Sequence, residues 1–230
     1  MNTSAFFYLS KHVKNVFTCA FLTFAISAIQ AETPIFEETF SDQKPGDQAH
    51  QLVNWQKHTG FPSESLTIQE DESNNLQLHL KASAISTLFS RDAFAIQVPY
   101  AVTFALTRHH DAGSWLRLTI QESGNLTNAY FFQFYARQIE VVRLAGEESE
   151  RIGKVEFDLQ DYPLGTPVQV RIQISTQKDG QTHVSLFLNE ELLIEGNDPL
   201  TPLPSPLQLG LRAQENVEIS VDDIRLLSLP

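Results

Sequence analysis

Apolar and polar residues alternate with a period of two over most of the chain after Glu32. Such alternation places successive side chains on opposite faces of a strand, so that one face is buried and the other is solvated. Each run is short and ends at turn-forming residues. The runs that put apolar residues on one face are 76–80, 100–106, 116–120, 155–159, 168–174, 184–188 and 207–211. This pattern predicts an all-β protein with antiparallel sheets.

Tight reversals are expected at three places between these runs. Asp179-Gly180 is a pair suited to positive φ and predicts a hairpin. Asn189-Glu190 and the segment 122–125 are the other two candidates. The proline-dense segment 199–206 cannot pair as a central strand, so it is expected to run over the surface. Roughly a dozen short strands without a linker or a repeat predict a single sandwich or jelly roll.

The last strand contains two adjacent carboxylates, Asp222 and Asp223, that interrupt its alternation. The apolar residues before them occupy odd positions and those after them occupy even positions. They are Val217, Ile219 and Val221 before the aspartates, and Ile224 and Leu226 after them. A single extra residue restores the alternation, so the pattern predicts a β-bulge near the aspartates.

Residues 1–31 have the order of a secretory signal peptide. Lys11 and Lys14 precede an apolar run at 16–29, and cleavage is expected after Ala31 or, alternatively, after Ala28. That run has about 14 residues, whereas a membrane-spanning helix needs about 20. The bulky residues before Cys19 disfavour lipoprotein processing. We therefore expect an exported protein, periplasmic or extracellular, with one domain over residues 32–230 and no membrane span after cleavage.

Charge and cysteine content narrow the classes of partner. The chain has 28 acidic and 16 basic residues, a formal net charge of −12. An acidic protein is repelled by nucleic acid and by anionic membranes, so no nucleic-acid partner is expected, whereas neutral glycans are compatible. The one cysteine lies in the leader. Without disulfides, the domain depends on its core and on any cation that it binds.

Several landmarks follow one another in an informative order. They are Phe36–Asp42, Asn54-Trp55, 115–120, 129–135, 186–192 and Ser220–Arg225. This order resembles the concanavalin A-like jelly rolls of the laminin-G-like and bacterial 3-keto-disaccharide hydrolase type. In that group the corresponding segments are a first strand, an early tryptophan, a central strand pair, a hairpin that usually reads Asn-Gly, and a closing strand with an aspartate. The resemblance implies a two-sheet jelly-roll sandwich over nearly the whole mature chain.

The same resemblance implies a structural calcium ion. In several such jelly rolls an acidic residue of the first strand and an aspartate of the last strand hold Ca²⁺. The matching positions are Glu38, or its neighbour Glu37, and Asp222. Carboxylate oxygens suit this hard cation, which would join the two ends of the domain. The alternative is that these carboxylates are solvated and that Asp222 only accompanies the bulge.

The central strand pair contains a candidate carbohydrate-binding surface. If the leucines and the isoleucine of 116–120 point inward, Trp115 and Arg117 point outward. On the next strand Gln133 is the polar member of the set with Phe131 and Tyr135, so this set is expected outward as well. Flat aromatic faces beside planar polar groups suit the stacking of sugar rings. The alternative is that these aromatic residues have no binding role and are present only because strands favour aromatic side chains.

Motifs for catalysis are absent from the sequence. Laminarinase-type jelly rolls carry Glu-x-Asp-x-x-Glu on one strand, and this chain lacks that string as well as Gly-x-Ser-x-Gly. His109-His110 enters a segment that ends at Gly113 and is expected to be a solvated loop. The acidic clusters 70–72 and 147–150 are expected to be solvated turns.

These observations lead to three hypotheses about function. The first is an exported, non-catalytic domain that binds an oligo- or polysaccharide and holds a structural cation. The second is a sugar-acting hydrolase similar to the 3-keto-disaccharide hydrolases. The third is an extracellular adhesion or structural module. No organic cofactor is expected for any of them.

Overall fold

Two antiparallel β-sheets, one of eight strands and one of seven, make up the folded part of the chain. The structure is a computed structural model, and the signal peptide expected at residues 1–31 lies outside the described residues except for Ala31. In the described part, no helix is long and apolar enough to cross a membrane. The described residues are 31–48, 52–57, 66–82, 86–110, 116–158, 161–200, 202–213 and 217–230.

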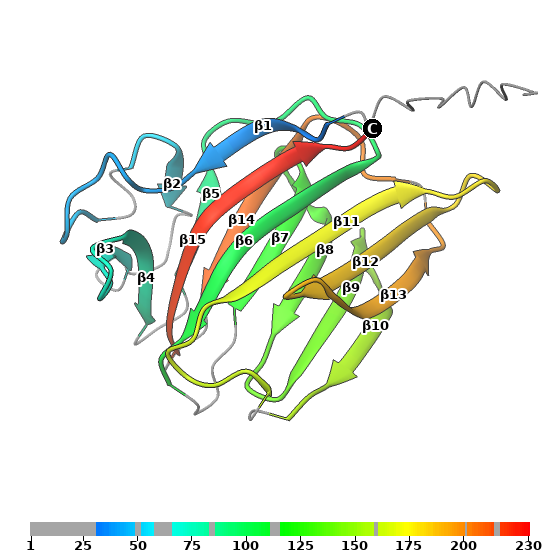
Figure 1. The fold of residues 1–230 in the computed structure, drawn as a ribbon. Coiled ribbons are helices and arrows are strands. Elements are labelled where there is room, and N and C mark those ends of the chain that lie inside the picture. The colour runs from blue at the N-terminus through cyan, green and yellow to red at the C-terminus, as the bar shows by residue number, and fades with distance from the viewer. Residues whose placement is uncertain are drawn as a thin grey trace, which may run out of the picture. The chain divides into compact units, whose positions relative to one another are not determined.

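The eight-stranded sheet, sheet A, has the order β13-β12-β11-β6-β15-β4-β3, with β1 paired to β15. The last strand is therefore internal: it pairs with β6 along most of its length, with β4 at its start and with β1 at its end. Figure 1 shows β1 and β15 side by side at one edge of the view. The strands are β1 Thr33–Glu38, β3 Leu66–Glu70, β4 Leu76–Ala82, β6 Tyr100–Arg108, β11 Val168–Thr176, β12 Thr182–Leu188, β13 Glu191–Asp198 and β15 Val217–Ser228.

The seven-stranded sheet, sheet B, has the order β10-β9-β8-β7-β14-β5-β2. Its centre is the expected strand pair β7 and β8, with β14 on the other side of β7. Its strands are β2 Trp55–Lys57, β5 Ser86–Ser90, β7 Leu116–Glu122, β8 Asn125–Phe134, β9 Gln138–Ala145, β10 Glu148–Glu156 and β14 Leu207–Ala213. The prediction of an all-β, two-sheet antiparallel jelly-roll sandwich is confirmed.

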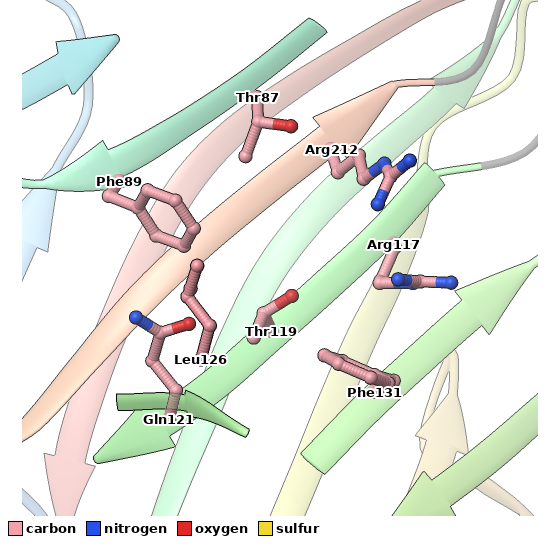
Figure 2. Close-up of a pocket in the computed structure, with 8 residues that line it drawn as sticks. All are labelled: Thr87, Phe89, Arg117, Thr119, Gln121, Leu126, Phe131 and Arg212. Carbon is pink, nitrogen blue, oxygen red and sulfur yellow. The ribbon is translucent and has the colours of Figure 1, made fainter. Parts of the chain in front are cut away.

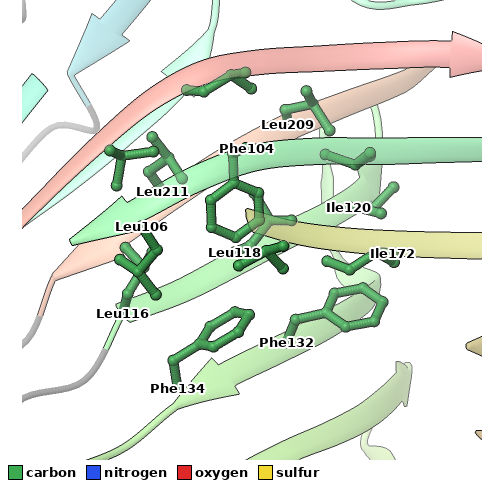
Figure 3. Close-up of a cluster of buried hydrophobic side chains, with 14 of the residues drawn as sticks. Phe104, Leu106, Leu116, Leu118, Ile120, Phe132, Phe134, Ile172, Leu209 and Leu211 are labelled. Atoms are coloured by element: carbon green, nitrogen blue, oxygen red, sulfur yellow. The ribbon is translucent and has the colours of Figure 1, made fainter. Parts of the chain in front are cut away.

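The inner faces of the two sheets form one hydrophobic core. Figure 3 shows Phe104 and Ile172 of sheet A with Leu118 and Phe132 of sheet B in one buried cluster. Each of these side chains is fully or almost fully buried. Burial of one such side chain contributes about 1.5–3 kcal/mol, and the alternation seen in the sequence supplies them from nearly every strand. The side chains at the remaining, alternate positions of each strand therefore face outward.

The bulge predicted for the closing strand is present. The register between β15 and β6 shifts between Asp222 and Arg225, and Asp223 has a φ of 50°. The extra residue lets Ile219 and Val221 before the bulge and Ile224 after it all enter the core. Glu218, Ser220 and Asp222 consequently face outward on sheet A. They line a cavity there.

The three predicted reversals are also confirmed. Gly180, with φ 84°, turns the chain between β11 and β12, and Gly124, with φ 78°, turns it between β7 and β8. Asn189 and Glu190 both have positive φ, 47° and 70°, and connect β12 to β13. Two successive positive φ values match the twist of the flanking strands, although a glutamate is strained there where glycine is not.

One segment differs from its prediction. The acidic cluster at 147–150 was expected to be a turn, and the next strand was expected at 155–159. In the structure Glu148, Ser149 and Glu150 open β10, which ends at Glu156. This strand lies at the edge of sheet B and its first four residues are exposed on both sides, so it has no apolar alternation for a pattern to detect. Charged residues are a common means of protecting such an edge.

A buried polar cluster links the two sheets through three side chains. Arg143 of β9 donates from Nε to Asp198 Oδ2 at 3.0 Å, and the Tyr130 hydroxyl donates to the same oxygen at 2.5 Å. Asp198 ends β13 of sheet A, whereas Arg143 and Tyr130 belong to sheet B. The Arg143 guanidinium also lies 5.0 Å from the centre of the Tyr130 ring. Burial, together with the Asp198 carboxylate, raises the pKa of the Tyr130 hydroxyl.

Candidate functional site

The outer face of sheet B carries the candidate site. The core takes alternate residues of β7 and β8, such as Leu118 and Phe132, so their neighbours Arg117, Phe131 and Gln133 project to the other side. The neighbouring strands β5 and β14 follow the same rule. A surface built from four adjacent strands is held rigidly, because each strand is hydrogen-bonded on both sides.

A cavity of about 220 Å³ lies on this face. Figure 2 shows side chains from β5, β7, β8 and β14 arranged around it, with Arg117 and Arg212 next to each other at one end. The surface combines two aromatic rings, two guanidinium groups, two hydroxyls and an amide. Its lining residues are Thr87, Phe89, Arg117, Thr119, Gln121, Leu126, Phe131 and Arg212.

Arg117 is held from two directions. Its Nε and Nη2 donate to Gln133 Oε1 at 3.2 and 2.7 Å, and its guanidinium lies 4.4 Å from the centre of the Phe131 ring. Burial lowers the pKa of the Arg117 guanidinium, and the nearby charge of Arg212 lowers it further. An amide acceptor below one edge and an aromatic ring against the flat face fix the orientation of the planar group before any ligand arrives.

The apolar side of the cavity depends on a glycine. A Cβ atom placed on Gly210 of β14 would lie 2.5 Å from Cε1 of Phe89, which is far inside van der Waals contact. The ring of Phe89 therefore rests directly on the backbone of the neighbouring strand. Gly210 is required here by this close approach, which makes a flat aromatic wall beside Thr119.

Gln121 supplies a buried amide at the same cavity. Its side chain donates from Nε2 to Gln208 Oε1 at 3.2 Å, and the residue is 2% exposed. Its Oε1 has no hydrogen-bond partner among the described residues. A buried carbonyl oxygen without a donor is unfavourable by about 1–3 kcal/mol, and a ligand hydroxyl is one group that satisfies it.

The structure brings three of the five residues expected to form the platform together. Arg117 and Phe131 line the cavity, and Gln133 orients Arg117 from beside it. Tyr135 follows the end of β8 and borders a different, largely apolar cavity. Its pKa is raised by burial and by Glu140. Trp115 lies outside the described residues, so its part in the platform stays a prediction.

Sequence reasoning missed most of the cavity wall, above all Arg212, Phe89 and Gln121. The alternation of 207–211 already implies that Arg212 faces outward, because the core residues of that strand occupy odd positions. That β14 lies beside β7, and β5 beside β14, comes only from the sheet topology.

The residues expected to hold calcium have separate partners. Glu38 accepts from the backbone N–H of Phe40 and from Asn54 Nδ2, both at 3.0 Å. Asp222 accepts from Asn75 Nδ2 at 2.5 Å and from the backbone N–H of Asp223 at 2.8 Å. Within the described ranges, no group of three or more His, Cys, Asp or Glu side chains is placed to hold a metal ion. Cation binding stays a prediction.

A second, larger cavity of about 660 Å³ lies on the outer face of sheet A. Ser220 Oγ lies 2.8 Å from His109 Nε2 and 3.2 Å from His79 Nδ1, within hydrogen-bonding distance of both imidazole rings. Burial lowers the pKa of both histidines, and for His79 the neighbouring His109 adds to this effect. His109 follows β6 in a loop and is exposed, as expected, and its ring also lies against Ser220.

Two carboxylates of this second cavity, Glu218 and Asp222, lie in different environments on the same strand. Burial raises the pKa of Asp222, whereas a hydrogen bond from Lys81 lowers that of Glu218. Such divergent environments suit an acid and a base. The two residues, however, are four positions apart on one strand, about 13 Å at the usual rise. Inverting glycosidases place their two carboxyl groups about 6.5–9.5 Å apart, which is less than this separation along the backbone.

Comparison with known proteins identifies the fold of the chain. No protein-family model and no curated protein matches the sequence. The structure is similar to that of SCLam, a non-specific endo-β-1,3(4)-glucanase from family GH16, with a TM-score of 0.64 and 12% sequence identity over 87% of this chain and 92% of that chain. The chain has the concanavalin A-like jelly-roll fold.

Other jelly rolls of this group cover the chain to a similar extent. A protein of unknown function with a galectin-like fold from Bacillus subtilis matches with a TM-score of 0.59 and 10% identity, over 86% of this chain and 98% of that chain. The carbohydrate-binding module CBM66 from Bacillus subtilis matches with a TM-score of 0.54 and 10% identity, over 77% of this chain and 98% of that chain. At these identities the concanavalin A-like fold is shared, whereas residues of the sites are not comparable.

Proposed function

We propose that the protein binds an oligo- or polysaccharide on the outer face of sheet B and does not cleave it. The observation that carries this proposal is the cavity in which Phe131 and Phe89 stand beside the guanidinium of Arg117 and the amide of Gln121. Aromatic faces stack on the apolar side of a pyranose ring, and planar polar groups pair with its hydroxyls. The fold supports the proposal, because CBM66, a carbohydrate-binding module, shares it.

The experiment combines a glycan array with an assay for the release of reducing sugar from each glycan that binds. Binding without release is the expected result. Release of reducing sugar would instead favour a hydrolase, the second hypothesis. No binding and no release would favour the adhesion or structural module.

Matched variants locate the binding surface. Phe131→Ala and Gln133→Ala are expected to weaken binding about tenfold or more, because stacking and a charge-assisted hydrogen-bond network are lost. Phe187→Ala and Gln173→Ala are the matched controls, because they remove side chains of the same two types from the outer face of sheet A, where both residues are half-buried. They should leave affinity unchanged. Equal losses of glycan affinity in both pairs of variants would show that the binding surface does not lie on sheet B.

The proposal includes export to the periplasm or the medium and a structural calcium ion. Cell fractionation and the N-terminal sequence of the mature protein test the first, with Glu32 or Ile29 as the expected first residue. Thermal unfolding with and without a chelator tests the second. Glu38 and Asp222 already accept hydrogen bonds from N–H donors, so a cation there would bind through their remaining lone pairs. An unchanged midpoint in the presence of chelator would refute the cation.

A further inference from the structure

Two glutamine side chains determine which way round the Gln121 amide lies at the cavity on sheet B. Gln208 Nε2 donates to the backbone carbonyl of Ser90 at 2.6 Å, so Gln208 presents its Oε1 to Gln121. Gln121 Nε2 donates to this oxygen at 3.2 Å. Exchanging the nitrogen and the oxygen of Gln121 would place two carbonyl oxygens against each other. Gln121 therefore keeps its Oε1, an acceptor, for another partner.

The oxygen of this amide is buried without a donor. Gln121 is 2% exposed and lines the cavity, and its Oε1 accepts no hydrogen bond from the residues that the structure describes. A buried acceptor that has lost water and gained no donor is unfavourable. A ligand that brings a donor to this oxygen removes the penalty, so the cavity selects for an N–H or an O–H at this point.

Apolar side chains occupy the same end of the cavity as this acceptor. Figure 2 shows Phe89, Leu126 and Gln121 at one end, with the Gln121 oxygen on the side of Leu126. Leu126 is 47% exposed, although its side chain is large and apolar. Phe89 rests against the backbone of Gly210. This end of the cavity thus suits a group that has one donor beside an apolar part.

The polar groups of a sugar differ in how well they meet this requirement. A hydroxyl has two acceptor lone pairs beside its one donor, so the lone pairs lose water against apolar side chains. The nitrogen of an acetamido group donates and does not accept. In the planar trans amide the methyl group lies on the same side as the N–H, and the carbonyl oxygen points the opposite way. An N–H at Gln121 therefore brings a methyl group to the apolar end.

We infer that the ligand contains an N-acetylhexosamine, whose N–H donates to Gln121 Oε1 and whose methyl group packs against Leu126 and Phe89. This inference rests on the proposed function and names its substrate class. The acetamido carbonyl then faces the other end of the cavity, where Figure 2 shows Arg117. Gln208 is a positioning residue, because it holds Gln121 in the accepting orientation.

The test compares sugars that differ only in this group. Chitotriose is titrated beside cellotriose, which has hydroxyls in place of the acetamido groups, and methyl N-acetylgalactosaminide is titrated beside methyl galactoside. Ligand-observed NMR measures the affinities. The acetamido member of at least one pair is expected to bind about tenfold tighter or better, because it gains both a hydrogen bond and a buried methyl group.

Glutamine variants assign the preference to the buried acceptor. Gln121→Met removes the acceptor and is expected to bring the ratio of acetamido to hydroxyl affinities close to one. Gln208→Met should lower the same ratio, since it frees Gln121 to turn its amide round. Gln173→Met, which removes a half-buried glutamine from the outer face of sheet A, is the matched control and should keep the full ratio.

A leucine variant tests the position of the methyl group at an exposed residue. Leu126→Ala should weaken binding of the acetamido sugar about threefold or more, because part of the apolar contact is lost. Leu192→Ala is the matched control, since Leu192 is 45% exposed on β13 of sheet A, and it should leave the affinity unchanged. The wild-type comparison needs no variant, so a folding defect in Gln121→Met leaves the test intact.

The outcomes separate this inference from the proposed function. Equal affinities within each pair, or a preference that survives in Gln121→Met, would overturn the N-acetylhexosamine and leave carbohydrate binding standing. So would a protein that binds other glycans of the array but neither acetamido sugar. Failure of every glycan to bind would overturn both. A preference that is lost in Gln121→Met and kept in Gln173→Met supports both.

Discussion

Arg143 and Arg117 lie over two consecutive aromatic residues of β8, but on opposite sides of sheet B. Arg143 covers Tyr130 inside the sandwich, and Arg117 covers Phe131 outside it. The inner arginine is 2% exposed and bonds a carboxylate that is fully buried. The outer one bonds an amide and shares its cavity with another arginine. The same residue type is thus enclosed beside a carboxylate at one position and faces a cavity at the other.

The largest effect is expected from Asp198→Ala, which leaves the Arg143 charge buried without its carboxylate. Breaking one side of a buried ion pair is unfavourable by about 3–5 kcal/mol. Chemical denaturation measures the free energy of unfolding. Glu32→Ala removes the partner of Arg171 from a half-exposed pair and should change stability by about 1 kcal/mol or less. Similar losses in both variants would remove the distinction between enclosed and open arginines.

A smaller effect, about 1–3 kcal/mol, is expected from Tyr130→Phe, because Asp198 loses a donor while it stays buried. The neighbouring change Phe131→Leu should alter stability by about 1 kcal/mol or less. Its effect should appear in glycan affinity instead. Denaturation and calorimetry on both variants test this opposition, and a Phe131→Leu protein that loses stability but not affinity would contradict it.

Arg117→Met should have a still smaller effect on folding. It removes a cation–π contact at the surface, which contributes about 0.5–1 kcal/mol, and it also removes an unfavourable charge beside Arg212. A change in the free energy of unfolding close to zero is expected, together with a clear loss of glycan affinity. A loss of stability as large as that from Asp198→Ala would place Arg117 among the structural arginines.

His79 lies between the enclosed and the open side chains in its surroundings, and its expected effect on stability is the smallest. It lies on the outer face of sheet A but is only 6% exposed, between His109, Glu218 and Lys81. Burial holds its pKa below the usual 6.5, so the unfolded chain binds more protons than the folded one as pH falls. The contribution of neutral His79 to stability is complete above pH 6.5 and is lost as the pH falls below that value.

Unfolding curves between pH 7.5 and pH 5.5 measure this effect. The wild-type protein should lose stability over that range, and His79→Gln should lose less of it. An identical pH dependence in both proteins would show that His79 is not the group responsible.

The sequence predicts which face of its strand a side chain occupies better than it predicts which strands lie side by side. Arg117 was predicted to face outward because the apolar residues beside it take the core positions. Phe131 and Gln133 were predicted outward because Gln133 is the polar member of their set, and the structure places all three so. Arg212 and Phe89 could not be joined to them, because they come from strands distant in the chain that only the jelly-roll topology brings alongside β7. The turn expected at Glu148 is a strand, since an edge strand exposed on both sides needs no apolar alternation.

The bulged closing strand also governs when the domain can fold. β15 pairs with β1, β4 and β6, which come from the first half of the chain. Those strands stay without their central partner until Ser228 has been synthesised, so sheet A is completed only after all of its other strands have been made. Contacts between distant parts of a chain slow folding and leave strand edges open in the meantime. A chain truncated before Val217 should therefore aggregate instead of forming a smaller sandwich.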